Sequence, residues 1–459
     1  MHKVPKGMTL VVGLGISGRA ICRHLSRQGV PYMVADTRAV PPDVDDFRAA
    51  HPGVEIHCGT LTSLDLSEVE EVVLSPGVDP RALGLAELAG RVRDATGDPL
   101  VVGEIALFVR ACGAPIVAIT GSNAKSTVTT LIGEMAREAG RRVAVGGNLG
   151  TPALDLLDDE PNADCYVLEL SSFQLETTPR LGAESAVFLN LSEDHLDRHG
   201  DMAGYRAAKL GIFRGARHGV VNAEDPMTWP ETRLPAQDRF TTRAPAAGEW
   251  GVGRREGRDW LMHGDKPLML ADEVRLPGRH NQANALAALA VGRHLALPLD
   301  AMRRVLRRFP GLPHRCEWIA DIGGVRWIND TKGTNVAATL AAIAGLGPTL
   351  EGRLVLLAGG MGKGADFRPL ADPLARYGRE AILFGLDAGR LEKALGGAVR
   401  VTQVDDLEAA MVRAQAIAEP GDCVLLSPAC ASLDQFANYQ ERGEVFRRWV
   451  GLCATGVSS

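Results

Sequence analysis

Two glycine-rich loops, each placed between a short apolar strand and a helix, constrain the fold of this chain more than any other feature. The first loop runs from Gly13 to Gly18 and the second from Gly121 to Thr127. Near-continuous apolar strands of this length are typical of parallel sheets that helices cover on both faces. The sequence therefore predicts an α/β protein built from repeated strand-helix-strand units.

The alternation of apolar runs and helical segments continues along the 459 residues and restarts late in the chain. Apolar runs at 10–12, 32–35, 72–74, 116–119, 143–145 and 166–168 are followed by a second set at 354–357, 381–384 and 423–426. Because one hydrophobic core cannot serve a chain of this length, we expect three α/β domains. Proline and glycine near 97–103 and at 309–313 predict their boundaries, which gives domains 1–103, 104–311 and 312–459.

The segment from about 238 to 275 differs from its surroundings. It is polar and rich in glycine, and it contains Trp250 and Trp260. This composition indicates a small antiparallel addition to the middle domain.

Charge and cysteine usage restrict the partners and the compartment. The net charge of -6 is weakly negative and gives no general electrostatic attraction to nucleic acid or to an anionic membrane. We therefore expect neither as a partner. The eight cysteines are scattered, without zinc-type spacing, which fits a reducing cytoplasm. No stretch reaches the roughly 18 apolar residues of a membrane span. We therefore expect a cytoplasmic protein that acts on small molecules.

The first loop has the spacing Gly13-x-Gly15-x-x-Gly18, and Asp36 follows the next strand. Such glycines let backbone amides approach a diphosphate at a helix N-terminus, and the acid can accept hydrogen bonds from a nucleoside. A Rossmann dehydrogenase is the obvious interpretation. In the alternative, the glycines only form a tight turn between strand and helix.

The second loop resembles a phosphate-binding loop without being a strict Walker A motif. Its amides would cradle phosphates, Lys125 would neutralise their charge, and the Ser126 hydroxyl could bind Mg²⁺. Ile119 and Ala124 occupy positions where the strict motif has glycine. Because Ala124 carries a Cβ, the backbone angle at this position must suit it.

Two further polar positions follow buried strands. Glu169 ends the strand at 166–168, where a phosphoryl-transfer site needs a ligand for Mg²⁺, although an acid at a strand end is more often simply solvated. His195 lies in a dense polar run from Asn190 to Asp197 and could contact a metal or an anion. The alternative is a helix cap made of Ser192 and its acidic neighbours.

Taken together, the two loops favour an enzyme that uses both. A dehydrogenase does not need a phosphate loop, and a simple nucleotide switch does not need a dinucleotide-type domain. Activation of a carboxylate by ATP, on a substrate that itself carries a nucleotide, would use both loops.

Separated motifs over nearly the whole chain carry a family resemblance. They are 13–18, 36–38, 75–77, 121–127, 146–150, 169–176, 193–197, Lys209, 280–284, 313–315, 329–335, 362–367 and 427–436. With these motifs the chain resembles the ATP-dependent Mur ligases of peptidoglycan synthesis. The runs 171–176 and 427–434 favour the member that adds D-glutamate over its siblings. Folylpolyglutamate synthetases, which are similar centrally, lack this N-terminal domain.

The resemblance implies both fold and reaction. It implies an N-terminal Rossmann-like domain for the UDP substrate, a central P-loop ATPase-like domain and a C-terminal Rossmann-like domain for glutamate. ATP would phosphorylate the terminal carboxylate of UDP-N-acetylmuramoyl-L-alanine, and the amine of D-glutamate would attack the acyl phosphate. Two Mg²⁺ ions and a carbamate on Lys209 are implied as well, in an enzyme expected to be a monomer.

The resemblance also carries over the roles of individual residues. Catalytic roles are implied for Lys125, Asn148, Glu169, His195 and Lys209, and metal binding for Ser126, Glu169, His195 and carbamylated Lys209. ATP binding is implied for Gly121, Ser122, Asn123, Ala124, Lys125, Ser126, Thr127, Asn281, Asn284, Arg315 and Asp330. The asparagines at 281 and 284 could instead cap a helix.

The two other substrates would have their own sets of residues. The UDP substrate is assigned to Gly15, Ile16, Ser17, Asp36, Thr37, Arg38, Ser75, Pro76, Gly77 and Asn148. Glutamate is assigned to His195, Lys332, Thr334, Lys363, Ser432, Leu433 and Tyr439. Amides at 432 and 433 would face an anion if a helix opens at Asp434, as we expect. In the alternative interpretation, Lys332 and Lys363 are simply solvated charged residues on loops.

The chain departs from the family pattern at Met361, where an aspartate is expected, and at Thr331 and Gly333. These departures leave the reaction class unchanged and concern the affinity of the glutamate site. Other interpretations are another Mur-type amino-acid ligase, including one that adds L-glutamate, and a nicotinamide-dependent dehydrogenase. A silent nucleotide-binding regulator is a further alternative, although the sequence lacks none of the expected catalytic groups.

Overall fold

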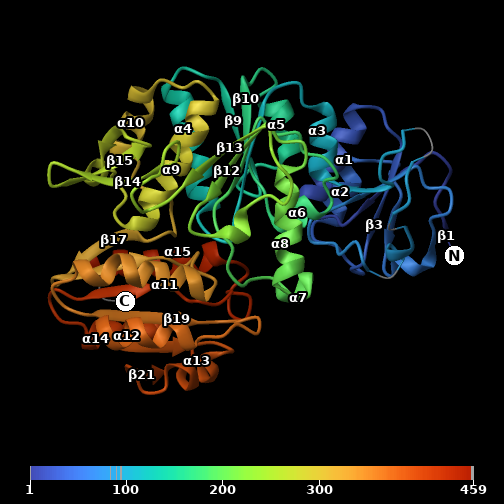
Figure 1. The fold of residues 1–459 in the computed structure, drawn as a ribbon. Coiled ribbons are helices and arrows are strands. Elements are labelled where there is room, and N and C mark those ends of the chain that lie inside the picture. Colours follow the sequence, from blue (N-terminus) through green and yellow to red (C-terminus); the bar gives the residue numbers. More distant parts are fainter. Residues whose placement is uncertain (1, 83, 89, 94–95, 456–459) are drawn as a thin grey trace. The chain divides into compact units, whose positions relative to one another are not determined.

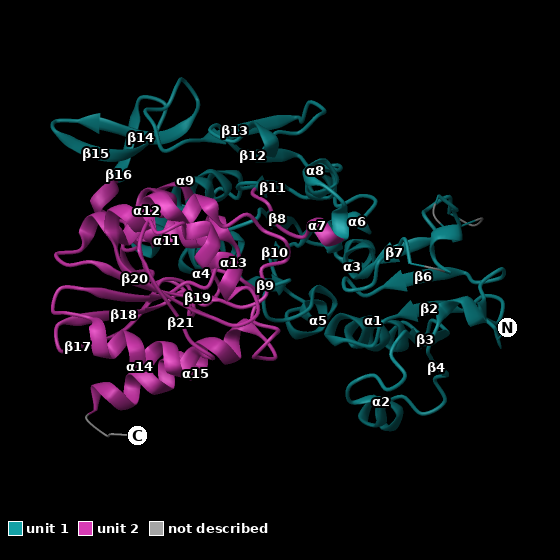
Figure 2. Cartoon of the chain, turned by 90° about the horizontal axis from the view of Figure 1, so that it is seen from below, with its two compact units in different colours: residues 1–191, 198–269, 284–305 teal, residues 192–197, 270–283, 306–459 magenta. Residues whose placement is uncertain are grey.

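A computed structural model describes residues 2–82, 84–88, 90–93 and 96–455 (Figure 1). The chain divides into two compact units, coloured separately in Figure 2. Unit 1 contains residues 1–191, 198–269 and 284–305, and unit 2 contains residues 192–197, 270–283 and 306–459. Each unit is described by itself.

The N-terminal part of unit 1 is built on a parallel five-stranded sheet with the order β4-β3-β2-β6-β7. Its strands are β2 (Thr9–Val12), β3 (Tyr32–Asp36), β4 (Ile56–Cys58), β6 (Glu71–Leu74) and β7 (Val101–Gly103). Helices α1 (Ile16–Arg27) and α2 (Val44–Ala50) and the short 3₁₀ helices η1 (Leu61–Ser63) and η2 (Ala86–Leu88) connect them. Strands β1 (His2–Lys3) and β5 (Leu64–Asp65) pair separately. Every residue of β2 and β3 is buried, as expected for strands covered on both faces.

The central part of unit 1 contains a nine-stranded sheet with the order β16-β15-β14-β13-β12-β11-β8-β10-β9. Its strands are β8 (Ile116–Thr120), β9 (Val143–Gly147), β10 (Cys165–Glu169), β11 (Ser185–Phe188), β12 (His218–Asn222), β13 (Ala236–Phe240), β14 (Trp250–Arg255), β15 (Arg258–His263) and β16 (Lys266–Leu270). The pairings from β9 to β14 are parallel.

Helices lie between the central strands and continue beyond them. They are α3 (Glu104–Ala111), α4 (Lys125–Glu138), α5 (Ala153–Asp159), α6 (Ser172–Glu176), α7 (Leu196–His199), α8 (Met202–Leu210), α9 (Arg279–His294) and α10 (Leu299–Arg308). Short 3₁₀ helices are η3 (Gly211–Phe213) and η4 (Pro226–Thr228), and the following η5 (Ala271–Glu273) belongs to unit 2.

The predicted antiparallel addition is confirmed for β14 and β15, which pair antiparallel. Its predicted start was wrong, because β13 includes Asp238 and pairs parallel to β12. Asp238 is polar but buried, and it receives hydrogen bonds from His294, Trp250 and Arg293. A polar residue at this position therefore concealed the continuation of the parallel sheet.

Unit 2 is built on a six-stranded sheet with the order β17-β18-β22-β19-β20-β21. The strands are β17 (Glu317–Ile322), β18 (Val325–Asn329), β19 (Leu354–Gly359), β20 (Gly378–Phe384), β21 (Arg400–Gln403) and β22 (Cys423–Leu426). Strand β17 is antiparallel to β18, and the other pairings are parallel.

Helices cover both faces of this sheet, with α11, α12 and α13 on one side and α14 and α15 on the other (Figure 2). They are α11 (Val336–Leu346), α12 (Ala371–Tyr377), α13 (Ala388–Leu395), α14 (Leu407–Ile417) and α15 (Tyr439–Ala454), with η6 (Gly347–Thr349) and η7 (Arg368–Leu370) as 3₁₀ helices. Separate apolar clusters fill the two faces. The predicted α/β class is confirmed.

The helix expected to open at Asp434 is absent, and α15 begins only at Tyr439. The amides of Gln435 and Phe436 instead donate to the Ser432 carbonyl in a turn. Asn438 supplies the helix cap, because its side chain accepts a hydrogen bond from the Glu441 amide. The amides of residues 432 and 433 therefore do not form a helix N-terminus.

Candidate functional site

The second glycine-rich loop joins the buried strand β8 to α4, as the sequence predicts. The Lys125 ammonium donates to the carbonyls of Gly121 and Ser122, at 2.9 and 3.1 Å, and so lies over the loop. The Asn123 amide donates to Asn190 Oδ1 at 2.8 Å, which ties the loop to the segment after β11. Ala124 has a φ of +64°, the left-handed conformation that the missing glycine would favour.

Glu169 ends β10, which lies between β8 and β9 in the sheet. Its Oε2 accepts a hydrogen bond from Ser126 Oγ at 2.5 Å, and its Oε1 accepts one from Asn148 Nδ2 at 2.6 Å. The side chain is 3% exposed. The structure thus brings together three residues that the sequence places in different motifs, because parallel strands end at one edge.

Lys209 lies in the last turn of α8 and is 1% exposed. Its ammonium donates to the Gly121 carbonyl at 2.8 Å and to Thr120 Oγ1 at 3.3 Å, and it lies 4.9 Å from the centre of the Tyr205 ring. A second lysine, from helix α8, therefore contacts the phosphate-type loop. Lys209 is therefore not an exposed surface lysine.

The first glycine-rich loop joins β2 to α1, with Gly15 at the N-cap. A Cβ at Gly18 would lie 1.8 Å from the Gly13 carbonyl oxygen, so the close helix-strand packing requires glycine there. Ser75 Oγ donates to that same carbonyl at 2.7 Å. Ile16 is 76% exposed beside the loop.

Asp36 holds this loop from the end of β3. Its carboxylate accepts a hydrogen bond from the Leu14 amide at 2.7 Å and a bidentate pair from Arg38. Burial alone would raise the pKa of Asp36, but these hydrogen bonds outweigh it and lower the pKa below its ordinary value. Asp36 is therefore a buried anion that orients Arg38. Thr37, Pro76 and Gly77 lie in the neighbouring loops.

Glu104 is a buried carboxyl that the sequence analysis missed. It is 1% exposed at the start of α3, its Oε1 accepts a hydrogen bond from the Leu154 amide at 3.3 Å, and its Oε2 is buried without a hydrogen-bond partner among the described residues. Burial raises its pKa. It joins the start of α3 to the start of α5, a tertiary relationship without a local sequence signal.

In unit 2, Asp330 follows β18 and is 7% exposed. It accepts hydrogen bonds from Ser427 Oγ at 2.7 Å and from the Cys316 amide at 3.1 Å. Burial raises the pKa of this carboxyl to about 6, although both hydrogen bonds and the charge of Arg315 oppose the rise. Arg315 lies in the segment that leads into β17.

Five of the seven residues assigned to glutamate lie on loops after three neighbouring strands, β18, β22 and β19. Lys332 and Thr334 follow β18, Lys363 follows β19, and Ser432 and Leu433 follow β22. The backbones of Met361 and Ala431 bond to one another in both directions at 2.9 Å, which joins two of the loops.

The side chains on these loops differ in their surroundings. The Lys332 ammonium lies 3.8 Å from the centre of the Tyr439 ring. The Lys363 ammonium lies 3.5 Å from Asp194 Oδ1. Ser432 is buried, whereas Leu433 is 62% exposed.

His195 also belongs to unit 2, where its amide donates to Asp194 Oδ1. Asn281, in the first turn of α9, donates from its side chain to the Pro277 carbonyl at 2.8 Å. Asn284 belongs to unit 1 and is 7% exposed. The two asparagines assigned to adenine are three residues apart in helix α9, so they lie one turn apart on the same side of that helix.

Backbone strain is concentrated in the same loops. Nine non-glycine residues in the described part of the chain have a positive φ, and six of them are Ala124, His195, His314, Cys316, Lys363 and Ala429. Such conformations are unfavourable and persist where the surrounding structure enforces them, often at functional sites. The phosphate-type loop and the loops of unit 2 share this property.

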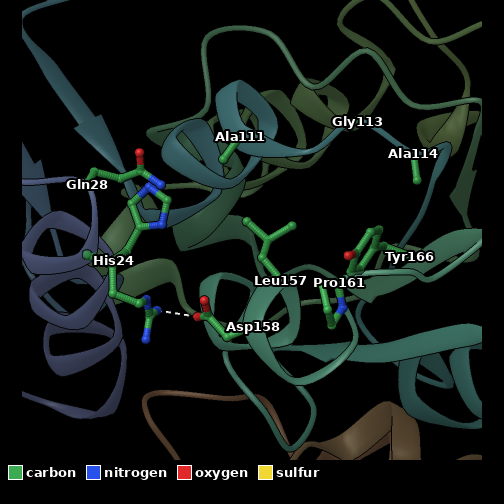
Figure 3. Close-up of a pocket in the computed structure, with 10 residues that line it drawn as sticks. His24, Gln28, Ala111, Gly113, Ala114, Leu157, Asp158, Pro161 and Tyr166 are labelled. Carbon is green, nitrogen blue, oxygen red and sulfur yellow. Dashed lines mark ion pairs between the residues drawn. The ribbon is translucent and has the colours of Figure 1, made fainter.

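A cavity of about 500 Å³ lies elsewhere in unit 1 (Figure 3). Its lining includes His24 and Gln28 near the end of α1, Leu157 and Asp158 near the end of α5, and Tyr166 near the start of β10. Asp158 forms an ion pair with Arg27. Ligands of open α/β sheets bind at the carboxyl ends of the strands, and this cavity lies at the opposite end of β10. It is therefore separate from the site described above.

Among the described helices, none combines the length and apolarity needed to cross a membrane. Nor do the described residues contain a group of three or more His, Cys, Asp and Glu side chains arranged to hold a metal. Mg²⁺ commonly takes only one or two carboxylates and completes its shell with phosphates and water. Ser126 and Glu169 match that smaller donor set.

Comparison with known solved structures supports the fold. The chain resembles UDP-N-acetylmuramate-alanine ligase MurC from Thermotoga maritima, with a TM-score of 0.59 and 16% identity over 97% of this chain and 99% of that one. MurF ligase from Thermotoga maritima in complex with ADP gives a TM-score of 0.59 and 16% identity over 98% of both chains.

Comparison of sequences supports the family. The Mur ligase MurD-like N-terminal domain matches residues 7–94, the Mur ligase middle domain 119–292, and the Mur ligase glutamate ligase domain 314–430. A UDP-N-acetylmuramoylalanine--D-glutamate ligase of Chromohalobacter salexigens is 67% identical over 98% of each chain. One of Pseudomonas aeruginosa is 51% identical, over 96% of this chain and 97% of that one. The chain therefore belongs to the Mur ligase family.

Proposed function

We propose that this protein is the ATP-dependent ligase that joins D-glutamate to UDP-N-acetylmuramoyl-L-alanine through an acyl phosphate. The observation that supports this most directly is the arrangement of Ser126, Asn148 and Glu169 at the edge of the phosphate-type loop. The names of relatives with 67% and 51% identity over nearly the whole chain agree with this substrate set.

ATP activates the substrate because a carboxylate at neutral pH is a poor electrophile and has no leaving group. Amides of the loop 121–127 and the Lys125 ammonium bind the phosphates of ATP. Asn281 and Asn284 bind adenine, and Arg315 and Asp330 reach the nucleotide from the C-terminal domain. Asn148, held against Glu169 by its side-chain amide, orients the carboxylate that is phosphorylated.

Mg²⁺ fits the residues around Glu169. Ser126 and Glu169 would hold one ion, and His195 and Lys209, the lysine as a carbamate, would hold a second. Bound there, the cations offset the repulsion between the anionic carboxylate and the γ-phosphate. Lys209 is buried beside the Gly121 carbonyl, and a carbamate on this side chain would replace a cation by an oxygen ligand.

The N-terminal domain, residues 1–103, binds the UDP moiety. The loop of Gly15, Ile16 and Ser17 faces the diphosphate, and the residues Asp36, Thr37, Arg38, Ser75, Pro76 and Gly77 contact the nucleoside and its phosphates. Because Asp36 is buried and fixes Arg38, the guanidinium of Arg38 makes the direct contact. The middle domain, residues 104–311, binds ATP in this proposal.

The C-terminal domain, residues 312–459, binds glutamate. A five-carbon amino diacid must present its amine to the acyl phosphate while its second carboxylate is anchored at a distance. Lys363, Thr334, Ser432 and the Leu433 amide hold that second carboxylate. Lys332, Tyr439 and His195 lie toward the α-carboxylate. We place the enzyme in the cytoplasm as a monomer, with small molecules as its partners.

Phosphate release tests the proposal. The full-length protein should release phosphate from ATP only when both D-glutamate and UDP-N-acetylmuramoyl-L-alanine are present with Mg²⁺. L-glutamate, meso-diaminopimelate, lysine and NADH serve as controls, because each represents another interpretation of the sequence. Release with one of the other amino acids in place of D-glutamate, or binding of NADH without ATP-dependent turnover, would contradict it.

A further inference from the structure

Arg442 is a fully buried cation near the start of α15. Its side chain is 0% exposed, and it ranks among the largest fully buried side chains of the described chain. In the described structure no Asp or Glu oxygen lies within 4.0 Å of its guanidinium. A charge in such a position needs hydrogen bonds from its surroundings, because burial without them is strongly unfavourable.

The guanidinium obtains these hydrogen bonds from three separate loops. Nε donates to Thr331 Oγ1 at 2.9 Å, and Nη2 donates to the Thr331 carbonyl at 3.0 Å. Nη2 also donates to the Cys430 carbonyl at 3.2 Å, and Nη1 reaches the Gly359 carbonyl at 3.4 Å. These acceptors lie at or just beyond the carboxyl ends of β18, β22 and β19, which are neighbours in the sheet.

Burial lowers the pKa of Arg442 to about 10, so the side chain remains charged at neutral pH. The planar guanidinium offers five donors in a fixed fork and can address several carbonyls at once. A lysine offers a single nitrogen and cannot keep all these directions. The chemistry of the site therefore favours arginine for its geometry.

The start of α15 packs tightly against the same loops. A Cβ at Gly443 would lie 2.3 Å from His314 Nδ1, so this helix approaches as closely as glycine allows. Asn329 Nδ2 donates to the Gly443 carbonyl at 3.2 Å, and Thr331 Oγ1 donates to the Tyr439 carbonyl at 3.2 Å. The helix thus carries Arg442 to a fixed place between the three loops.

We propose that Arg442 is a positioning residue that fixes the three loops carrying the glutamate-binding side chains. Lys332 directly follows Thr331, and Ser432 lies two residues after Cys430. Lys363 lies four residues after Gly359. This inference rests on the proposed function, since it assigns the three loops to glutamate.

Steady-state kinetics of the full chain test it. Arg442→Lys should raise the KM for D-glutamate about tenfold and leave the KM for UDP-N-acetylmuramoyl-L-alanine within about twofold, because the three loops lose their common anchor and the residues assigned to the UDP substrate lie outside these loops. Arg442→Gln should raise the KM for D-glutamate further. Arg448→Lys and Arg448→Gln are matched controls on the exposed side of the same helix and should leave both constants unchanged.

A purely structural role would lower thermal stability and the amount of active enzyme without changing the ratio of the two KM values. An unchanged ratio in Arg442→Lys would therefore overturn the inference, including the case in which Arg442→Gln does not fold. If the wild-type protein shows no turnover that depends on D-glutamate, the proposed function itself is wrong. That outcome is recognised without any variant.

Discussion

Ser126 Oγ and Glu169 Oε2 lie 2.5 Å apart and share a hydrogen bond that links the first turn of α4 to the carboxyl end of β10. Asn148 binds the other oxygen of the same carboxylate. A hydroxyl and an amide therefore fix the orientation of Glu169. Hydrogen bonds to an ionised acceptor are stronger than neutral ones, so this carboxylate is well suited to receive a cation in a defined geometry.

Glu169→Gln should lower kcat by about a hundredfold or more and raise the Mg²⁺ concentration needed for half-maximal rate. The amide keeps the size of the side chain but removes the negative charge. Phosphate release during a Mg²⁺ titration measures both effects. Glu160→Gln, at an exposed position of the same domain, is the control. Unchanged Mg²⁺ dependence in Glu169→Gln would remove this residue from the metal site.

Ala124→Gly should stabilise the protein by about 0.5–1 kcal/mol, because it removes the cost of a Cβ at a φ of +64°. The gain is reduced by the extra freedom that glycine gives the unfolded chain. Urea unfolding of both proteins checks the difference. Ala139→Gly is the matched control, since Ala139 has an ordinary φ of -83° and the same substitution should destabilise. A loss of stability in Ala124→Gly would show that strain is not the dominant effect.

The sequence predicts those parts of the site in which chemistry follows directly from a strand. The loop after β8, Glu169 at the end of β10 and the lysines after β18 and β19 are examples. An apolar run in the sequence predicts each strand, and the carboxyl ends of parallel strands lie at the same edge of their sheet. Within each sheet, the residues that follow neighbouring strands can therefore be placed near one another without coordinates.

Arg442, Glu104 and the turn at Asp434 could not be predicted in the same way. Arg442 occupies an ordinary helical position, and its acceptors lie 12 to 111 residues away in the chain. Glu104 meets the Leu154 amide across 50 residues. The helix expected at Asp434 is replaced by a turn, because Asn438 caps the helix and α15 begins only after it. In each case the observed structure depends on a contact that the local sequence pattern does not indicate.

Asp330 should make the stability of the protein depend on pH. Its pKa is about 6 in the folded protein against an ordinary 3.8, so the folded state holds this proton longer than the unfolded state. The contribution of Asp330 to the free energy of unfolding is fully present below about pH 4 and is lost as the pH rises through 6. This contribution amounts to up to about 3 kcal/mol.

Asp330→Asn should therefore flatten this part of the stability profile, with its largest gain over the wild type above pH 6. Urea unfolding at pH 5 and pH 8, without nucleotide, measures the difference. Asp372→Asn, at an exposed position of α12, controls for the loss of a charge. The same slope in Asp330→Asn and in the wild type would assign the pH dependence to other groups.

Lys363→Ala should raise the KM for D-glutamate about tenfold or more, with a much smaller effect on the KM for ATP. Lys363 has a φ of +49° and places its ammonium 3.5 Å from Asp194, so the loop holds it in a defined position. Lys393→Ala removes an exposed lysine from the same domain and should change neither constant. A collapse of ATP binding with an unchanged KM for glutamate would assign Lys363 to the nucleotide.

Lys209→Ala should abolish most of the activity, and added formate or acetate should restore part of it. In the proposed metal site, a bare ammonium would repel a divalent cation, whereas a carbamate supplies an anionic oxygen. The cavity left by the truncated side chain can admit a small carboxylate in its place. Lys266→Ala, at an exposed position, should show neither the loss nor the rescue.

A second measurement separates the carbamate from a purely structural role of Lys209. Wild-type protein equilibrated with ¹³C-labelled bicarbonate should show a carbamate carbon signal in NMR spectra, and Lys209→Ala should lack it. Full activity of the variant without added carboxylate would contradict the proposal, as would identical spectra of the two proteins. Burial at 1% exposure explains why such a group would persist, because bulk water cannot readily protonate and release it.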